Sequence, residues 1–238
     1  MADNKETAHD PIIDALFSVG AHFGYRRSKR HPSAIPFIFG SKGGVEIFDL
    51  EKSRTALLEA EVFLKELGAT GKTALFVSSK PEACEALKAG AEKINMPYVA
   101  GRWIGGTLTN FPQIRSRIDK MLDLISKREK GELSKYTKKE RLLIDRDIVK
   151  LDELFAGLVP LTALPAALVV VDPGKEHTAI AEAKKTGIPV VALANSDCNL
   201  KVATYAVPGN DATRKSVAFF VERMVAAYEA GKMGTNNQ

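Results

Sequence analysis

Residues 101–110 (GRWIGGTLTN) gather side chains that could bind a phosphate or another polar group. The run holds the only tryptophan of the chain. Arginine forks onto phosphate oxygens, and hydroxyl and amide side chains hydrogen-bond to a phosphate backbone. Because no Gly-Lys-Ser/Thr closes the run, it does not fit the phosphate loop of a nucleotidase. We therefore expect something polar to dock here. The candidate side chains are Arg102, Trp103, Thr107, Thr109 and Asn110.

Residues 25–31 (YRRSKRH), called the basic loop below, carry five groups that can be positive. Such a charge density does not fit a core, and Pro32 and Pro36 disfavour a helix. Two interpretations stay open: a solvated loop, or contact with a phosphate backbone while Tyr25 or His31 stacks on a base or sugar. The basic side chains are Arg26, Arg27, Lys29, Arg30 and His31, and Lys42 in a later turn extends the same surface.

Two other segments resemble enzyme motifs without completing them. Asp172 and His177 follow the most apolar run and could form an acid–base pair, but no serine or cysteine nucleophile stands beside them. Because Asp-Pro-Gly is equally typical of a turn that caps a helix, we favour that interpretation. The segment GNDATRKS lacks the glycine that a phosphate loop needs where Arg214 stands. We expect a helix start there, capped by Asn210 or Asp211.

No metal motif is visible from residue spacing, and we expect no metal and no cofactor. Cys84 and Cys198 are far apart in the sequence, which indicates free thiols in a reducing compartment. A metal site assembled in three dimensions near His22, Asp197 and Asp211 stays open.

The composition is that of a mildly basic globular protein. The 238 residues are 45% hydrophobic and carry a formal charge of +5, which favours a polyanionic partner without proving one. The N-terminus has several acidic residues and no apolar run of signal-peptide length, and no stretch approaches the ~20 apolar residues that span a bilayer. We expect a soluble, cytoplasmic protein.

Apolar runs alternate with helix-like segments along most of the chain. Runs that are apolar throughout indicate a parallel sheet covered on both faces. The predicted fold class is therefore α/β, a doubly wound, mainly parallel sheet flanked by helices, of the Rossmann or flavodoxin type. A Ser-Lys-Gly-Gly turn between two further runs predicts a hairpin. The expected hairpin strands are 35–40 and 45–50, the other strands 73–77, 97–100, 166–171, 189–194 and 202–207, and the helices 51–67, 81–93, 176–185 and 211–230.

Residues 112–157 interrupt this alternation. Two segments repeat apolar residues every three or four positions and carry charges elsewhere, which predicts an inserted antiparallel coiled-coil helical hairpin. The α/β domain would then be discontinuous, comprising residues 1–111 and 158–238. Most hairpin charges are expected to be solvated, and only Arg115 and Arg117, near the glycine-rich run, are expected to touch a ligand.

Several motifs follow one another in an order that identifies a family. They read GAHFG, FIFG with EIFDL, RWIGGTLTN, DPGKEH, GIPVV and PGND, the last ending at Asp211. Over residues 11–230 the chain resembles the bacterial-type family of small-subunit ribosomal protein S2. The resemblance implies an α/β domain with an inserted coiled-coil hairpin. It also implies a structural, non-enzymatic constituent of the small subunit that binds ribosomal RNA and neighbouring proteins, and helps to hold ribosomal protein S1.

By position, the resemblance assigns RNA contact to the basic loop and to the run 101–110. Two other functions remain as alternatives. The first is a small-molecule α/β enzyme that uses a crevice near Asp172 and His177, and the second is a scaffold that binds only proteins through the hairpin. The residues implied to contact RNA are Arg26, Arg27, Lys29, Arg30, His31, Arg102, Trp103, Thr107, Thr109 and Asn110, to which the charge argument adds Lys42, Arg115 and Arg117.

Overall fold

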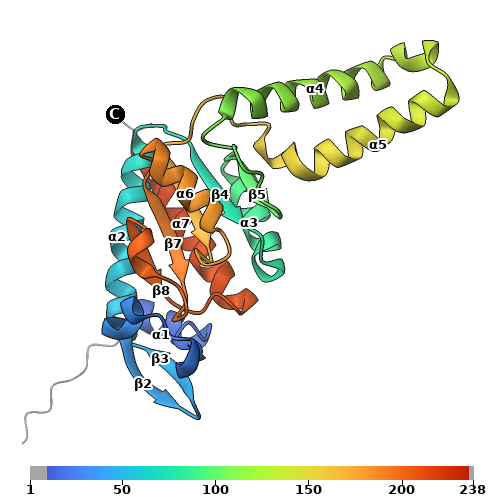
Figure 1. Ribbon diagram of the computed structural model, residues 1–238. Coiled ribbons are helices and arrows are strands. Elements are labelled where there is room, and N and C mark those ends of the chain that lie inside the picture. The colour runs from blue at the N-terminus through green and yellow to red at the C-terminus, as the bar shows by residue number, and fades with distance from the viewer. Residues whose placement is uncertain (1–9, 236–238) are drawn as a thin grey trace, which may run out of the picture.

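The computed structural model describes residues 10–235, and the acidic N-terminal segment lies almost wholly outside them. Five parallel strands form the main sheet in the order β5-β4-β6-β7-β8 (Figure 1). Every residue of the three central strands is buried, as expected for a sheet covered on both faces. The strands are β4 (Ala74–Ser78), β5 (Tyr98–Ala100), β6 (Ala167–Val171), β7 (Val190–Ala194) and β8 (Tyr205–Pro208).

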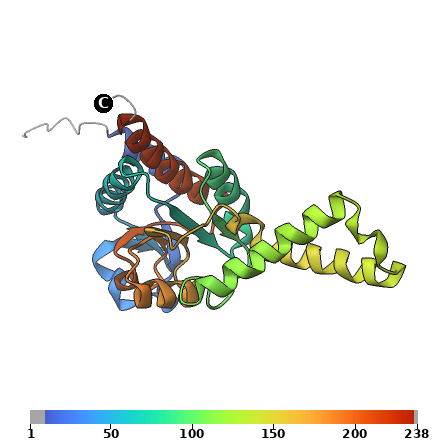
Figure 2. The same cartoon turned by 90° about the horizontal axis from the view of Figure 1, so that it is seen from above.

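Helices cover both faces of this sheet, which confirms the predicted doubly wound α/β class (Figures 1 and 2). Alternate residues of a strand point to opposite faces. Accordingly, Phe76 packs in the cluster formed with α2, α3 and α7, whereas its neighbour Leu75 packs in the cluster that contains α6. The helices are α2 (Leu50–Ala69), α3 (Pro81–Lys93), α6 (His177–Thr186) and α7 (Arg214–Thr235).

The chain order of the sheet reverses between β4 and β6. From β4 the chain continues to β5 on one side, and it later returns to β6 on the other. In open α/β sheets the carboxyl ends of two such strands border a crevice, where ligands of this fold class bind. The residues that follow β4 and β6 are therefore candidates for a site.

A second, three-stranded antiparallel sheet lies beside α1, in the order β1-β3-β2. The predicted hairpin is present, but its first strand starts later because Pro36 lies in a 3-10 turn. Gly43 and Gly44 have φ of 60° and 79°, which suits the tight two-residue turn between the strands. Sequence analysis did not identify α1 or β1. The elements are α1 (Pro11–Ser18), β1 (Phe23–Arg26), η1 (Arg27–Lys29), η2 (Pro32–Phe37), β2 (Ile38–Lys42) and β3 (Val45–Phe48).

Two long helices, α4 (Phe111–Glu129) and α5 (Lys138–Phe155), lie side by side and extend away from the sheet (Figures 1 and 2). Two short 3-10 segments, η3 (Glu132–Lys135) and η4 (Ala156–Leu158), follow them in turn. Along α4, Met121 is buried on the apolar side, whereas its neighbour Leu122 is exposed. The division of the chain into domains at 112–157 stays a prediction.

The last helix, α7, continues through Thr235, beyond the predicted end at about residue 230. It packs along α2, and two glycines allow the close approach: a Cβ on Gly68 would collide with the carbonyl of Tyr228, and one on Gly231 with the carbonyl of Lys65. No helix in residues 10–235 is long and apolar enough to cross a membrane.

Candidate nucleic-acid interface

The run 101–110 links β5 to α4, and several of its N–H and O–H groups turn inward onto one carboxylate. Glu182, on α6, is 6% exposed. Its Oε1 accepts from the indole N–H of Trp103 at 3.1 Å and from the N–H of Gly106 at 2.8 Å. Its Oε2 accepts from the N–H groups of Leu108 and Thr109 at 3.0 and 3.1 Å, and from the Thr109 hydroxyl at 3.0 Å. The run is therefore a loop folded around an internal anion.

This arrangement buries two of the residues that were expected to contact RNA. Trp103 is buried at 9% exposure and Thr107 at 1%, and the Thr107 hydroxyl donates to the carbonyl of Ile104 at 2.6 Å. Neither side chain is open to an external base or phosphate in this structure, so RNA contact is not proposed for them. The Trp103 indole serves Glu182 and the Thr107 hydroxyl serves the carbonyl of Ile104 instead of an outside polyanion.

Three residues of the run keep an exposed surface. Arg102 and Asn110 are exposed, and the Asn110 side chain makes no capping hydrogen bond at the start of α4. Thr109 is exposed as a residue, although its hydroxyl is held by Glu182. Of the run, Arg102 and Asn110 have the side chains best placed to reach a ligand.

The basic loop divides into outward and inward side chains. Arg30 pairs with the buried Glu46 at 3.0 Å, and the Nδ1 of His31 accepts from the N–H of Ser33 at 3.2 Å, at the start of η2. Both therefore help to hold the loop. The exposed members are Arg26, Arg27 and Lys29.

The exposed cations of this surface lack acidic partners among residues 10–235. No ion pair joins Arg26, Arg27, Lys29 or Lys42 to a carboxylate there, and the Nζ of Lys29 lies 6.0 Å from the ring centre of Tyr25. In the small sheet, Arg26 and Lys42 both pair with Val45 on the strand between them. Paired residues project from the same face of a sheet, so these two cations lie on one face.

The two arginines at the start of α4 have different surroundings. Arg115 donates to the carbonyls of Val159 and Leu161 at 3.1 and 3.2 Å and pairs with Asp119 at 2.9 Å. It thereby joins the beginning of α4 to the chain that leaves α5. Arg117 is exposed, and no described acidic residue pairs with it. Only Arg117 is free to contact a partner molecule.

A buried lysine lies where the crevice of the main sheet was expected. The Nζ of Lys80, just after β4, is 2.8 Å from the Oδ2 of Asp172 after β6 and 2.7 Å from the Oδ2 of Asp211 after β8. The other oxygen of Asp211 accepts from the Nδ2 of Asn195 at 2.8 Å. Sequence analysis missed Lys80. Lys80 could have been identified from its position just after an almost wholly apolar strand, where ligands bind in open α/β sheets.

The pKa values of Lys80, Asp172 and Asp211 depend on one another and on their burial. Burial opposes the ammonium, but attraction from Asp211 and hydrogen bonds to both carboxylates outweigh it and raise the pKa of Lys80. For Asp172 burial is likewise outweighed, by Lys80, so its pKa is lowered. For Asp211 burial prevails over Lys80, and its pKa is raised. Because burial and nearby carboxylates raise the pKa of Cys198, its sulfur stays a thiol.

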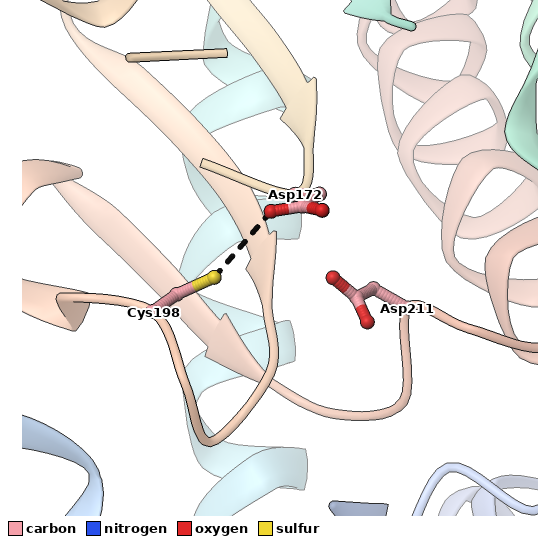
Figure 3. Close-up of side chains that lie close together, drawn as sticks. All are labelled: Asp172, Cys198 and Asp211. Atoms are coloured by element: carbon pink, nitrogen blue, oxygen red, sulfur yellow. Dashed lines mark hydrogen bonds between the residues drawn. The ribbon is translucent and has the colours of Figure 1, made fainter. Parts of the chain in front are cut away.

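Asp172, Cys198 and Asp211 offer ligand atoms within 4.8 Å of one another, as a metal site would (Figure 3). The Sγ of Cys198 donates to Asp172 at 3.5 Å. The ammonium of Lys80, bonded to both carboxylates, already supplies the positive charge that they need. The donor set therefore fits a lysine-centred ion cluster better than a metal ion.

The acid–base pair of Asp172 and His177, the alternative to the favoured turn, is not assembled. Asp172 has φ of 65°, and its Oδ1 accepts from the N–H groups of Gly174 and Lys175 at 3.0 and 3.1 Å, as the turn interpretation predicted. His177 is exposed at the start of α6. Asn210 and Asp211 do not cap α7 directly, because the helix begins at Arg214 and Asp211 faces Lys80.

Comparison with known proteins agrees with the motif order. The family model described as ribosomal protein S2 matches residues 16–231. A protein of Roseiflexus sp. (strain RS-1), named small ribosomal subunit protein uS2, is 40% identical over 218 residues, which are 92% of this chain and 83% of that protein. Proteins of the same name from Cytophaga hutchinsonii (40% identical, 92% and 84% covered) and Bdellovibrio bacteriovorus (37% identical, 91% and 69% covered) are also similar. The chain belongs to the ribosomal protein S2 family.

Proposed function

We propose that this chain binds small-subunit ribosomal RNA with the outward cations of the basic loop and the adjoining turn, as a structural and non-enzymatic constituent of the small ribosomal subunit in the cytoplasm. The observation that carries the proposal is the set of exposed cations without described acidic partners: Arg26, Arg27, Lys29 and Lys42. Surface cations without a carboxylate partner can neutralise the phosphates of an RNA backbone, and a firmly held loop keeps them in place for this contact.

The loop is held in a way that favours such contact. The pair of Arg30 with the buried Glu46 and the bond from the N–H of His31 to the carbonyl of Ser196 at 2.8 Å tie it to the body of the protein. Cations on a held loop lose less conformational freedom when they bind than cations on a free one. Arg30 and His31 thus contribute by orienting their neighbours.

A second contact area is proposed at the root of α4. Arg102, Asn110 and Arg117 are exposed there, and Thr109 lies beside them. Because Trp103 and Thr107 are buried, they are not included. This area offers fewer cations than the basic loop, so we expect it to position the RNA and contribute less to affinity.

We also propose that neighbouring ribosomal proteins, ribosomal protein S1 among them, contact the α4–α5 pair. Leu142, Leu143 and Val149 on α5 are between 50% and 54% exposed. Exposed aliphatic side chains that recur along one helix are typical of a surface that another protein covers. A scaffold that binds proteins alone would use this surface without the basic loop.

The test is assembly of the full chain carrying Arg26→Ala, Arg27→Ala and Lys42→Ala into small subunits, followed by RNA footprinting. We expect the footprint to weaken and the salt dependence of binding to fall by roughly 2 in slope, because each lost phosphate contact removes about 0.7 on single-stranded RNA. Sedimentation in sucrose gradients at moderate and high salt should show the unchanged chain on the small subunit and its release at high salt.

A matched control removes the same charge elsewhere. Lys65, Lys72 and Lys88 are exposed on or near α2 and α3, away from the basic loop, and their triple alanine variant should leave the footprint intact. An equal loss in both variants would mean that net charge, not the basic loop, drives binding. An unchanged footprint in the basic-loop variant would refute the assignment.

A further inference from the structure

We infer that Glu182 is a positioning residue for the projecting helices: its carboxylate holds the loop 101–110 closed and thereby fixes where α4 leaves the main sheet. The inference deepens the proposed function, because Arg102, Asn110 and Arg117 stand on this loop and the start of α4. Its test, however, is made on the isolated protein and does not depend on RNA binding.

The hydrogen bonds at Glu182 require an ionised carboxylate. Each of its oxygens accepts at least two hydrogen bonds, from Trp103 and Gly106 on Oε1 and from Leu108 and Thr109 on Oε2. A carboxylate has about four lone-pair sites and no donor, so it can accept from all four of these residues, with the N–H and the hydroxyl of Thr109 sharing one site. A glutamine of the same size has one acceptor oxygen, and its NH2 group would face two or three donors.

The closed loop continues directly into α4. The carbonyl of Asn110 accepts from the N–H groups of Gln113 and Ile114 at 3.1 and 3.4 Å and so opens the helix. Leu108 and Ile114 are buried in the cluster that covers the α6 face of the sheet. The bonds at Glu182 therefore lie one turn away from the first residues of α4.

The exit of the α4–α5 pair is fixed separately. Arg115 donates to the carbonyls of Val159 and Leu161, and a Cβ on Gly157 would collide with the carbonyl of Tyr98 on β5. Arg115 also ties the start of α4 to this exit, so the loop 101–110 is the part of the entry that a side-chain change can release. Glu182 is the residue at which this release is expected.

The first test compares Glu182→Gln with Glu85→Gln. Glu85 is an exposed glutamate on α3 with no described partner, so its change removes the same charge without breaking a bond. Amide exchange of peptides covering 103–110 should be about tenfold faster or more in Glu182→Gln, because three of the bonds are made by backbone N–H groups to a charged acceptor. The peptides of α2 and α7 should exchange as in the unchanged chain.

The second test reads the direction of the helices. Spin labels at Lys135, in η3 beyond α4, and at Lys88 on α3 report the distance between the projecting end and the main sheet, in a background where Cys84 and Cys198 are replaced by alanine. We expect Glu182→Gln to broaden this distance distribution and Glu85→Gln to leave it unchanged. An unchanged distribution with loosened loop amides would overturn the positioning role.

A milder variant covers the case in which Glu182→Gln does not fold. Thr109→Val removes one of the donors and leaves the carboxylate in place, so a smaller increase in exchange confined to 106–110 is expected. No increase would overturn the inference. Loss of RNA binding alongside normal exchange would instead concern the proposed function, since the loop would still be closed.

Discussion

Replacing Lys80 by methionine should destabilise the protein severely. Among the described residues, the change removes the only ammonium that contacts Asp172 and Asp211, whose side chains are 10% and 0% exposed. Breaking a buried ion cluster by deleting one partner leaves uncompensated charge in a poorly solvated place, at a cost of about 3–5 kcal/mol. Urea denaturation at pH 7 should show this loss of unfolding free energy, a large part of the stability of a typical domain.

The pH dependence of this deficit tests the cause. In the unchanged chain the pKa of Asp172 is lowered, so its contribution to stability is present above the ordinary carboxyl pKa and is lost as the pH falls through the lowered value. In Lys80→Met, burial and mutual repulsion raise the pKa of both carboxylates. As the pH falls, these carboxylates take up protons and lose their charge, so the destabilisation of the variant becomes smaller. The difference between the two proteins should therefore shrink toward acid pH.

The control is Lys88→Met, which removes a lysine paired at 3.9 Å with Glu92 where both side chains are more than half exposed. Such a surface pair contributes about 0–1 kcal/mol. If Lys80→Met unfolded with a similar small loss, or with a deficit independent of pH, the lysine-centred ion cluster would not carry the stability assigned to it.

Three further predictions concern the small sheet, helix packing and the loop. Arg30→Ala should lower the unfolding free energy by about 1–3 kcal/mol, because it leaves Glu46 buried without its partner; Arg26→Ala, an exposed cation of the same loop, should change it little. Gly68→Ala should cost about 1–3 kcal/mol by forcing α2 from α7, and an unchanged melting temperature would contradict that close approach. Burial raises the pKa of Glu182, but the N–H groups of Thr109 and Trp103 outweigh it and lower the pKa. The closed loop should thus persist above the ordinary glutamate pKa and open as the pH falls through the lowered value, and fluorescence of Trp103 should report the opening.

The sequence alone was sufficient for the architecture of the main sheet. Runs such as Ala167–Val171 are short, rich in valine and apolar at every position, which is typical of a strand covered on both faces, and the helix predicted at 81–93 agrees with α3. The small sheet was harder to predict. Strand β1 has four residues of mixed polarity, and its pairing with β3 depends on a partner outside the segment itself.

From the sequence alone, the charge density of the basic loop predicted that it lies at the surface, and the order of the motifs identified the family. Both features are local and can be recognised without knowing which residues they contact. Only the tertiary structure decided which donors face outward. Trp103 finds its acceptor 79 residues away, and Lys80 meets the backbone of Asp211 across 131 residues. The sequence does not show whether a hydrogen-bond donor faces the interior or the solvent. The fold decides this, because it brings a buried carboxylate to one donor and leaves another donor in contact with water.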